Sequence, residues 1–374
     1  MHQRTHETEV FVVGGGPAGL AAALAARQAG FDVVVADCAR PPIDKACGEG
    51  IMPEGLAALE RLGVRLDVAH AAPFSGICFI NGAQQVETRF RQGVGLGVRR
   101  TTLHEQLVNA ATVAGVRLLW ERRVTALTDG RVLLDGEPAR CRWVIGADGQ
   151  NSRIRQSVGL GDAGDERVRF GFRQHYRIKP WCESVEVHWG DCGQMYVTPT
   201  AADEVCVAFI TSQKTLRLQE AIGRFPQLAS SVAEALKEEP ARGAVTASRC
   251  LPRVHDKHVA LVGEAAGSVD AITGEGLAIA FRQAIALADA LIADDLSLYE
   301  AAHKRIMRLP RAMAALMLSM EGRPAFRRRV FRAFEAQPEI FARMLAIHTG
   351  DVSPVDFGVG NGLSLGWHLL TAKS

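Results

Sequence analysis

The apolar residues near the N-terminus change their period twice within a short stretch of chain. Val12 and Val13 end a β-branched run that is typical of a buried strand, and an alanine-rich stretch over Ala18–Gln28 predicts a helix. Gly30 ends this helix, and the apolar run Phe31–Ala36 predicts a second strand. The order strand, helix, strand predicts a βαβ unit.

The next hundred or so residues alternate short apolar runs with turn residues. Asp135 followed by Gly136 predicts a tight hairpin turn, because such turns need residues that tolerate a positive φ. We expect helices at Leu56–Leu62 and Thr102–Ala114, and strands at Phe74–Asn81, Gln85–Arg91, Arg117–Trp120, Val124–Leu127, Arg131–Leu134 and Trp143–Ile145.

A change of pattern between residues 165 and 251 predicts a separate mixed sheet inserted into the fold. Four runs alternate like strands with one solvated face, and Leu216–Leu236 interrupts the region with a helical pattern. A buried strand at His258–Val262 and a long apolar helix at Gly276–Ile292 follow, and from Ser297 the chain is mainly helical. A glycine-rich tail over Asp356–Ser374 shows no clear pattern. The four strands are expected at Val168–Arg177, Ser184–Trp189, Gln194–Thr198 and Val205–Ile210.

Composition narrows the class of protein. The chain has 374 residues and a net charge of +2, so nothing global points to nucleic acid as a partner. Its eight cysteines form no C-x-x-C pair, which favours reduced thiols in a cytoplasmic enzyme. The polar start MHQRTHETE argues against a signal peptide, and glycines interrupt the most apolar stretch, Val10–Ala26, so no membrane insertion is expected. His255 and His258 lack a third ligand at metal spacing, and we predict no metal site.

A glycine-rich turn joins the first strand to the first helix. Gly14, Gly16 and Gly19 have G-x-G-x-x-G spacing, and Pro17 and Ala18 open the helix. Such glycines permit a tight turn, the approach of a pyrophosphate and close packing of helix on strand. The free N–H groups of the helix N-terminus favour the diphosphate. At the end of the second strand, Asp37 is placed to accept hydrogen bonds from an adenosine ribose.

Three further motifs follow in order: RRTTLHEQL from Arg99, GADGQNSRIR from Gly146 and GEAAGSVDAITGEGLAIAFRQA from Gly263. Together with the glycine turn they resemble the family of FAD-dependent oxidoreductases that contains the aromatic-ring hydroxylases (group A flavin monooxygenases) and the geranylgeranyl reductases. The resemblance implies an α/β fold with a Rossmann-like FAD-binding domain of the glutathione-reductase and p-hydroxybenzoate-hydroxylase type, an inserted mixed β-sheet for substrate and a helical C-terminus. The implied boundaries are 1–72, 98–164 and 252–296 for the FAD domain, 73–97 and 165–251 for the sheet, and 297–374 for the helices.

The resemblance also assigns FAD-binding roles residue by residue. Glu264 stands where the family has the Asp of a GD motif that bonds the ribitol chain, and it is one methylene longer. The turn after it opens a helix whose N-terminus would stabilise negative charge on the flavin pyrimidine ring. The implied cofactor residues are Gly14, Gly16, Pro17, Ala18, Gly19, Asp37, Lys45, Cys47, Gly48, Arg100, Asp148, Gly149, Glu264, Thr273, Gly274, Glu275 and Gly276.

The K-x-C-G-E-G loop over residues 45–50 resembles the geranylgeranyl reductase branch, where it lies close to the isoalloxazine ring. Glu49 in this loop is the candidate catalytic residue, as a base or a group that orients substrate. A hydrogen bond that stabilises the loop is the alternative. Cys47 has no redox partner in a motif, which favours a small packing residue near the flavin.

The chemistry remains open between three alternatives. The chain has no second G-x-G-x-x-G, so NAD(P)H is expected to act as a transient reductant unless a separate protein reduces the flavin. An NAD(P)H-dependent monooxygenase of an apolar or aromatic, polyketide-like small molecule comes first, an ene reductase of the geranylgeranyl reductase kind second, and a flavin-binding subunit with a reductase partner third. The tryptophan motif of flavin halogenases is missing, and Met195–Pro199 keeps only Tyr and Pro of the reductases' Y-x-W-x-F-P motif.

Two groups of side chains have both a functional and a structural interpretation. Phe172, His175, Tyr196 and Phe209 are candidates for the substrate pocket, although core packing in the sheet is the simpler interpretation of each. The basic segment Phe326–Phe334 suits peripheral contact with a membrane or acidic partner, but a helix that packs its phenylalanines on the core is the simpler interpretation. The methionines at 307, 313, 317 and 320 are expected to pack between C-terminal helices.

Overall fold

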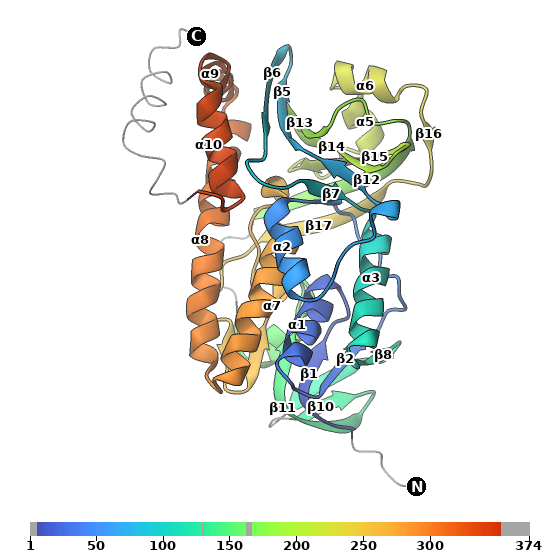
Figure 1. Ribbon diagram of the computed structural model, residues 1–374, viewed down its shortest axis with the longest axis vertical. Helices are drawn as coiled ribbons and strands as arrows, with labels where there is room; N and C mark the ends of the chain where they lie inside the picture. Colours follow the sequence, from blue (N-terminus) through green and yellow to red (C-terminus); the bar gives the residue numbers. More distant parts are fainter. Residues whose placement is uncertain (1–5, 129–130, 162–166, 353–374) are drawn as a thin grey trace.

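The computed structural model describes residues 6–128, 131–161 and 167–352. Figure 1 shows one sheet, with α1 and α7 beside it, in the lower half of the molecule and a second sheet above it, while α8–α10 line one side. The predicted α/β class with an inserted mixed sheet and a helical C-terminus is confirmed.

The first sheet has a core of parallel strands in the order β19-β11-β1-β2-β8. These strands are β1 (His6–Val13), β2 (Val33–Asp37), β8 (Arg117–Trp120), β11 (Glu137–Gly146) and β19 (Val259–Leu261), with β18 (His255–Asp256) antiparallel at one edge. The predicted hairpin at Asp135 and Gly136 joins β10 (Arg131–Leu134) to β11, and both residues have positive φ. β10 also pairs with β9 (Val124–Thr128).

Helix α1 (Pro17–Gln28) lies between α3 (Arg100–Val113) and α7 (Gly276–Ile292) beside this sheet. The alanines of α1 are buried, because small side chains let the helix approach both the sheet and α7. Helix α2 (Pro53–Arg61) packs against α7, and the short α4 (Arg153–Ser157) follows β11. The bounds of α7 agree with those predicted.

The second sheet has the order β16-β12-β15-β14-β13-β5-β6, and β17 pairs with the other half of β12. Only β5 and β13 run parallel; the other pairs are antiparallel. The strands are β5 (Gly76–Asn81), β6 (Gln84–Arg89), β12 (Arg167–Arg177), β13 (Ser184–Gly190), β14 (Gly193–Ala201), β15 (Glu204–Thr211), β16 (Leu236–Lys237) and β17 (Arg242–Ser248).

Three predictions for this region are corrected. The strand expected at Phe74–Asn81 is divided between two sheets, because Phe74 belongs to β4 (Ala72–Phe74) and not to β5. Strand β4 forms a small third sheet with β7 (Gly95–Gly97) and β3 (Gly50–Ile51), in which β7 pairs with both of the others. The helical pattern of Leu216–Leu236 forms only α5 (Leu218–Ile222) and α6 (Pro226–Val232), because Leu236 pairs with the edge of β12. Strands β13 and β15 do not have a solvated face: α5 and α6 cover one side, and the other faces the interior.

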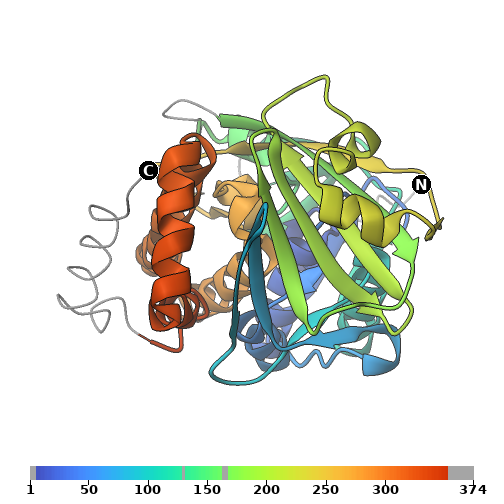
Figure 2. The same cartoon turned by 90° about the horizontal axis from the view of Figure 1, so that it is seen from above.

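The C-terminal helices are α8 (Leu296–Glu321), α9 (Pro324–Ala336) and α10 (Pro338–His348), and the tail Asp356–Ser374 lies outside the described residues. Seen from above, they stand beside the second sheet (Figure 2). Phe331 of α9 packs against Phe79 of β5, and Phe334 stacks on Phe341 of α10, as the core-packing interpretation predicts. Among the described helices, none has the length and apolar character needed to cross a membrane.

Candidate functional site

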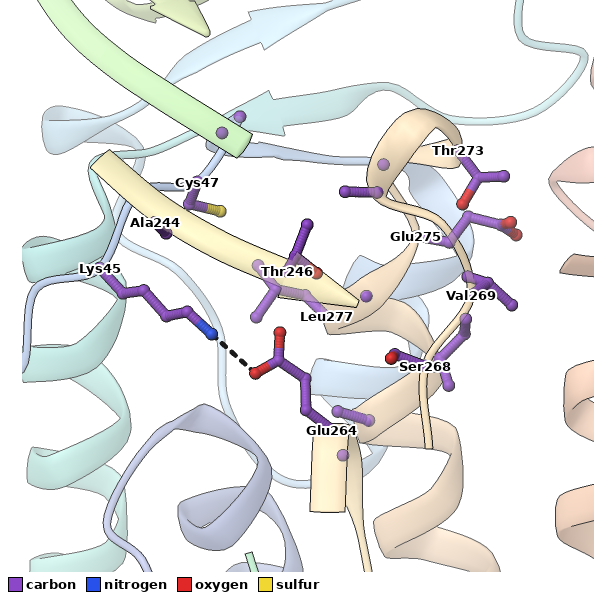
Figure 3. A pocket seen from close by; sticks show the side chains of 18 of the residues that line it. Lys45, Cys47, Ala244, Thr246, Glu264, Ser268, Val269, Thr273, Glu275 and Leu277 are labelled. Carbon is purple, nitrogen blue, oxygen red and sulfur yellow. Dashed lines mark hydrogen bonds and ion pairs between the residues drawn. The ribbon is translucent and has the colours of Figure 1, made fainter. Parts of the chain in front are cut away.

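A cavity of about 770 Å³ extends from the glycine turn of the first sheet to the space between the second sheet and the C-terminal helices. It brings together segments that are far apart in the chain: the turn before α1, the loop over residues 45–50, and the segment over residues 263–277 that ends in α7. Figure 3 shows Lys45 and Cys47 on one side of this cavity and Glu264, Ser268 and Glu275 on the other.

The glycine turn has the geometry of a diphosphate cradle. A Cβ on Gly14 would lie 2.4 Å from the carbonyl oxygen of Ala147, and one on Gly19 would lie 1.8 Å from that of Gly14, so the backbone leaves no room for side chains there. A Cβ on Gly16 would meet no protein atom within 4 Å. No side chain caps α1, which leaves its first N–H groups free for an anion.

Asp37 stabilises this turn through hydrogen bonds to the backbone. Its Oδ2 accepts a hydrogen bond of 2.6 Å from the backbone N–H of Gly15, and its Oδ1 accepts one of 2.8 Å from Ala39. Each carboxylate oxygen has a second lone pair, so the side chain can still accept hydrogen bonds from a ribose.

Arg100 and Asp148 both border the cavity. The Nε of Arg100 is buried and has no hydrogen-bond partner among the described residues. One carboxylate oxygen of Asp148 is already hydrogen-bonded within the protein: Oδ2 accepts hydrogen bonds from the backbone N–H groups of Arg153 and Ile154 at the start of α4. Gly149, the second residue of this motif, has a φ of 80° and lies beside Glu264.

Lys45 and Glu264 form an ion pair across the cavity, with Nζ 2.6 Å from Oε2. Both side chains remain more than a third exposed, so they are open to a bound molecule. Thr273, Gly274, Glu275 and Gly276 line the same cavity at the start of α7. A Cβ on Gly274 or Gly276 would meet no protein atom within 4 Å, which again leaves space beside a helix N-terminus.

Glu49 borders the cavity, but its side chain is buried inside the protein. Its side chain has no exposed surface, and its carboxylate accepts hydrogen bonds of 2.6 Å each from Arg173 and His175 and one of 3.0 Å from the N–H of Arg100. Burial alone would raise the pKa of Glu49, but the hydrogen bond and charge of His175, together with Arg173, bring it below its ordinary value. This geometry favours the loop-stabilising alternative over a catalytic base.

Glu49, His175 and Cys206 have ligand atoms close enough together to hold a metal ion. Arg173 already donates to Glu49, however, and burial raises the pKa of the Cys206 thiol well above its ordinary value. The guanidinium disfavours a second cation, and burial disfavours the thiolate that a metal would need, so we assign no metal here.

The comparison with known proteins agrees with the geometry. A sequence model described as the FAD binding domain matches residues 7–305. This protein belongs to the FAD-binding domain family. It is a FAD-dependent oxidoreductase, and the free helix N-terminus, the open glycines and the unpartnered Arg100 Nε fit a bound FAD.

Several reductases are similar in sequence to this flavoprotein. Menaquinone reductase of Mycobacterium tuberculosis (strain H37Rv) is 30% identical over 312 residues, which are 72% of each chain. That of Mycolicibacterium smegmatis is 35% identical over 162 residues, which are only 40% of each chain. Digeranylgeranylglycerophospholipid reductase 2 of Methanopyrus kandleri is 30% identical over 296 residues, or 72% of this chain and 73% of that protein.

Solved structures show the same fold at lower identity. A flavoprotein/dehydrogenase from Cytophaga hutchinsonii superposes with a TM-score of 0.79 at 18% identity and 96% coverage of both chains. The 2-methyl-3-hydroxypyridine-5-carboxylic acid oxygenase gives 0.73 at 24% identity, with 85% of this chain and 93% of that chain covered.

The four predicted pocket residues of the flavoprotein divide between the two faces of the second sheet. Tyr196 faces the cavity and donates a hydrogen bond of 2.7 Å to the carbonyl of Ile272. Phe172 and Phe209 border the cavity with part of their atoms, but their rings stack on each other and pack in the cluster formed with α5 and α6. His175 is held by Glu49 and does not line the cavity. Side chains alternate along a strand, so Phe172 and His175 point to opposite faces.

Sequence reasoning missed the far wall of the cavity. Strands β5 and β13 contribute only apolar side chains to it, and helices α8–α10 contribute apolar side chains and His348. Met307, Met317 and Met320 pack against neighbouring elements as predicted, and all four predicted methionines, including the half-buried Met313, border this wall. Its apolar members are Ile77, Phe79, Val185, Val187, Met307, Met313, Leu316, Met317, Met320, Phe334, Phe341, Met344 and Leu345.

Proposed function

We propose that this flavoprotein reduces a carbon–carbon double bond in a long apolar molecule of the isoprenoid type, with NAD(P)H as a transient reductant. The observation that carries this proposal is the apolar far wall of the cavity, which is continuous with the FAD cradle. Flexible methionine side chains adapt to an irregular hydrocarbon chain better than branched residues do. The names of the reductases that match most of the chain support the same class of reaction.

The monooxygenase that the motifs placed first becomes the second candidate. It is supported by the fold that this protein shares with the oxygenase described above. At 24% identity that similarity is evidence for the fold and not for the reaction. The two reactions need the same cradle and the same exclusion of water, so the walls of the cavity do not separate them.

FAD supplies the redox chemistry of either reaction when it is bound. The residues of the chain hold and orient the two molecules. The N-terminus of α1 and the 14–19 turn would hold the diphosphate, and Lys45 and Glu264 lie beside the cavity centre. The N–H groups at the start of α7 would stabilise negative charge on the ring. The second sheet and α8–α10 keep water from the substrate.

The test is an anaerobic single turnover. Holoenzyme reduced with dithionite is mixed with a menaquinone or with a geranylgeranylated lipid, and the product is analysed by mass spectrometry. We expect a product heavier by two hydrogen atoms, formed without oxygen. A product that forms only in air and contains one added oxygen atom would establish the monooxygenase instead. Turnover with dithionite but not with NADH or NADPH would point to a separate flavin-reducing partner.

A further inference from the structure

A group of buried titratable side chains lies at the turn over residues 273–276, where α2, α7 and α10 meet, and two of its members border the cavity. Glu275 is the N-cap residue of α7, Glu54 lies in the first turn of α2, and His348 is the last residue of α10. In Figure 3 the carboxyl group of Glu275 points away from the Lys45–Glu264 pair. Glu275 therefore does not compete with that pair for the cavity centre.

The polar atoms of this group lack partners. The Oε2 of Glu275, the Nδ1 of His348 and both carboxylate oxygens of Glu54 are buried without a hydrogen bond among the described residues. The side chains of Glu275 and His348 are 4% and 10% exposed, and Oε2 lies 3.7 Å from Nδ1. A neutral imidazole carries one proton, and the ring of His348 donates it to the backbone of Thr273. Because Nδ1 is the ring atom without a partner, this proton lies on Nε2 and Nδ1 is an acceptor. Oε2 and Nδ1 can then bond only if the carboxyl group is protonated.

The surroundings place that proton on Glu275. Burial, reinforced by the charge of Glu54 and opposed by Arg282, raises the pKa of Glu275 to about 8. Burial also raises the pKa of Glu54 to about 7, with Arg282 and Asp351 acting in opposite directions, and it lowers the pKa of His348 to about 4. The imidazole is therefore neutral at physiological pH, and Thr273, the other polar neighbour, carries no charge.

We propose that Glu275 is a positioning residue that holds a proton at Oε2 whenever the flavin is reduced, and that its O–H bonds Nδ1 of His348. Reduction by a two-electron reductant adds negative charge to the flavin ring at the start of α7. An ionised Glu275 at the same helix end would repel this charge. Where the carboxylate is ionised before reduction, it therefore binds one solvent proton at Oε2, forming one O–H bond, and no other bond of the residue changes.

The first experiment measures the flavin potential of the holoenzyme against a reference dye, during dithionite reduction, from about pH 6 to about pH 9. Wild type is compared with Glu275→Gln, which is isosteric and carries no titrating proton, and with Glu339→Gln, an exposed glutamate at the start of α10. We expect Glu275→Gln to match wild type near pH 6, and its flavin to be roughly tenfold easier to reduce than that of wild type near pH 9. The control Glu339→Gln should follow the wild-type curve at every pH. Parallel curves for wild type and Glu275→Gln would overturn the proposal.

The second experiment does not depend on whether Glu275→Gln retains FAD. Infrared difference spectra of oxidised and reduced wild-type holoenzyme near pH 8.5, roughly at the raised pKa, report a protonated carboxyl group that appears on reduction. We expect its carbonyl band to appear in wild type and in Glu339→Gln. If wild type shows no such band, Glu275 takes up no proton and the proposal fails, whatever the behaviour of the variant.

Discussion

Lys45 and Glu264 are 219 residues apart in the chain, yet the Nζ of the lysine lies 2.6 Å from Oε2 of the glutamate. This contact joins the loop over residues 45–50 to the segment that follows β19 and precedes α7. Both residues line the cavity. Because each side chain is more than a third exposed, the pair contributes little to stability, less than about 1 kcal/mol. We propose that the pair sets the charge beside a bound flavin.

Lys45→Met should weaken FAD binding without unfolding the protein. The substitution leaves the negative charge of Glu264 uncompensated next to a cofactor that itself carries a diphosphate. We expect the Kd of the apoprotein for FAD, measured by fluorescence titration, to rise about tenfold. The double variant Lys45→Met/Glu264→Gln removes both charges and should recover most of the affinity. Equal affinities in wild type and both variants would show that the pair has no role in binding.

Gly16→Val should abolish FAD retention while the apoprotein stays folded. The backbone of Gly16 is extended, with φ −70° and ψ 175°, and a Cβ there meets no protein atom, so the valine fits the chain and fills only the diphosphate position. Absorbance of the purified protein and its melting temperature measure the two effects separately. Gly161→Val, at an exposed glycine with equal space around it, is the matched control and should retain the yellow colour.

Arg173→Met should destabilise the fold by roughly 3–5 kcal/mol, because it leaves Glu49 charged and buried without the guanidinium that pairs with it. Arg177→Met, four residues along the same strand, breaks only exposed or half-exposed ion pairs and should cost less than about 1 kcal/mol. Urea unfolding of the two variants measures the difference. A similar small loss in both would mean that Arg173 does not hold the 45–50 loop.

The lowered pKa of Glu49 also gives stability a definite dependence on pH. The folded state binds fewer protons than the unfolded state between the lowered pKa and the ordinary value of 4.5. This contribution is therefore fully present above about pH 4.5 and is lost as the pH falls through the folded pKa. Glu49→Gln should be less stable than wild type near neutral pH, and the difference should shrink in acid. A difference that is constant across the acid range would contradict the ion-pair account.

Phe331→Ala should cost roughly 3–5 kcal/mol, since the ring is fully buried between α9 and the second sheet. Arg328→Ala, at an exposed position of the same helix, should change stability by less than about 0.5 kcal/mol. Thermal unfolding of both variants provides the comparison. If Phe331→Ala were as stable as Arg328→Ala, the phenylalanine face of α9 would not be part of the core.

Local pattern was enough to predict much of the FAD half of the molecule. The turn at Gly14–Gly19, the hairpin at Asp135 and the bounds of α7 depend on backbone conformation and periodicity, which neighbouring residues determine. The same alternation rule already separates Phe172 from His175, because residues an odd number of positions apart on a strand face opposite sides. Counting parity along Val168–Arg177 could therefore have removed one of them from the pocket.

The sequence by itself determined the family, the cofactor and the glycine cradle, since these depend on short motifs whose residues are close together in the chain. Only the tertiary structure decided that Glu49 is bonded to Arg173 and His175, that Lys45 meets Glu264, and that the methionines of α8 form a cavity wall. These contacts join segments more than a hundred residues apart. Their geometry depends on how two sheets and three helices pack, and no local pattern of residues specifies that packing.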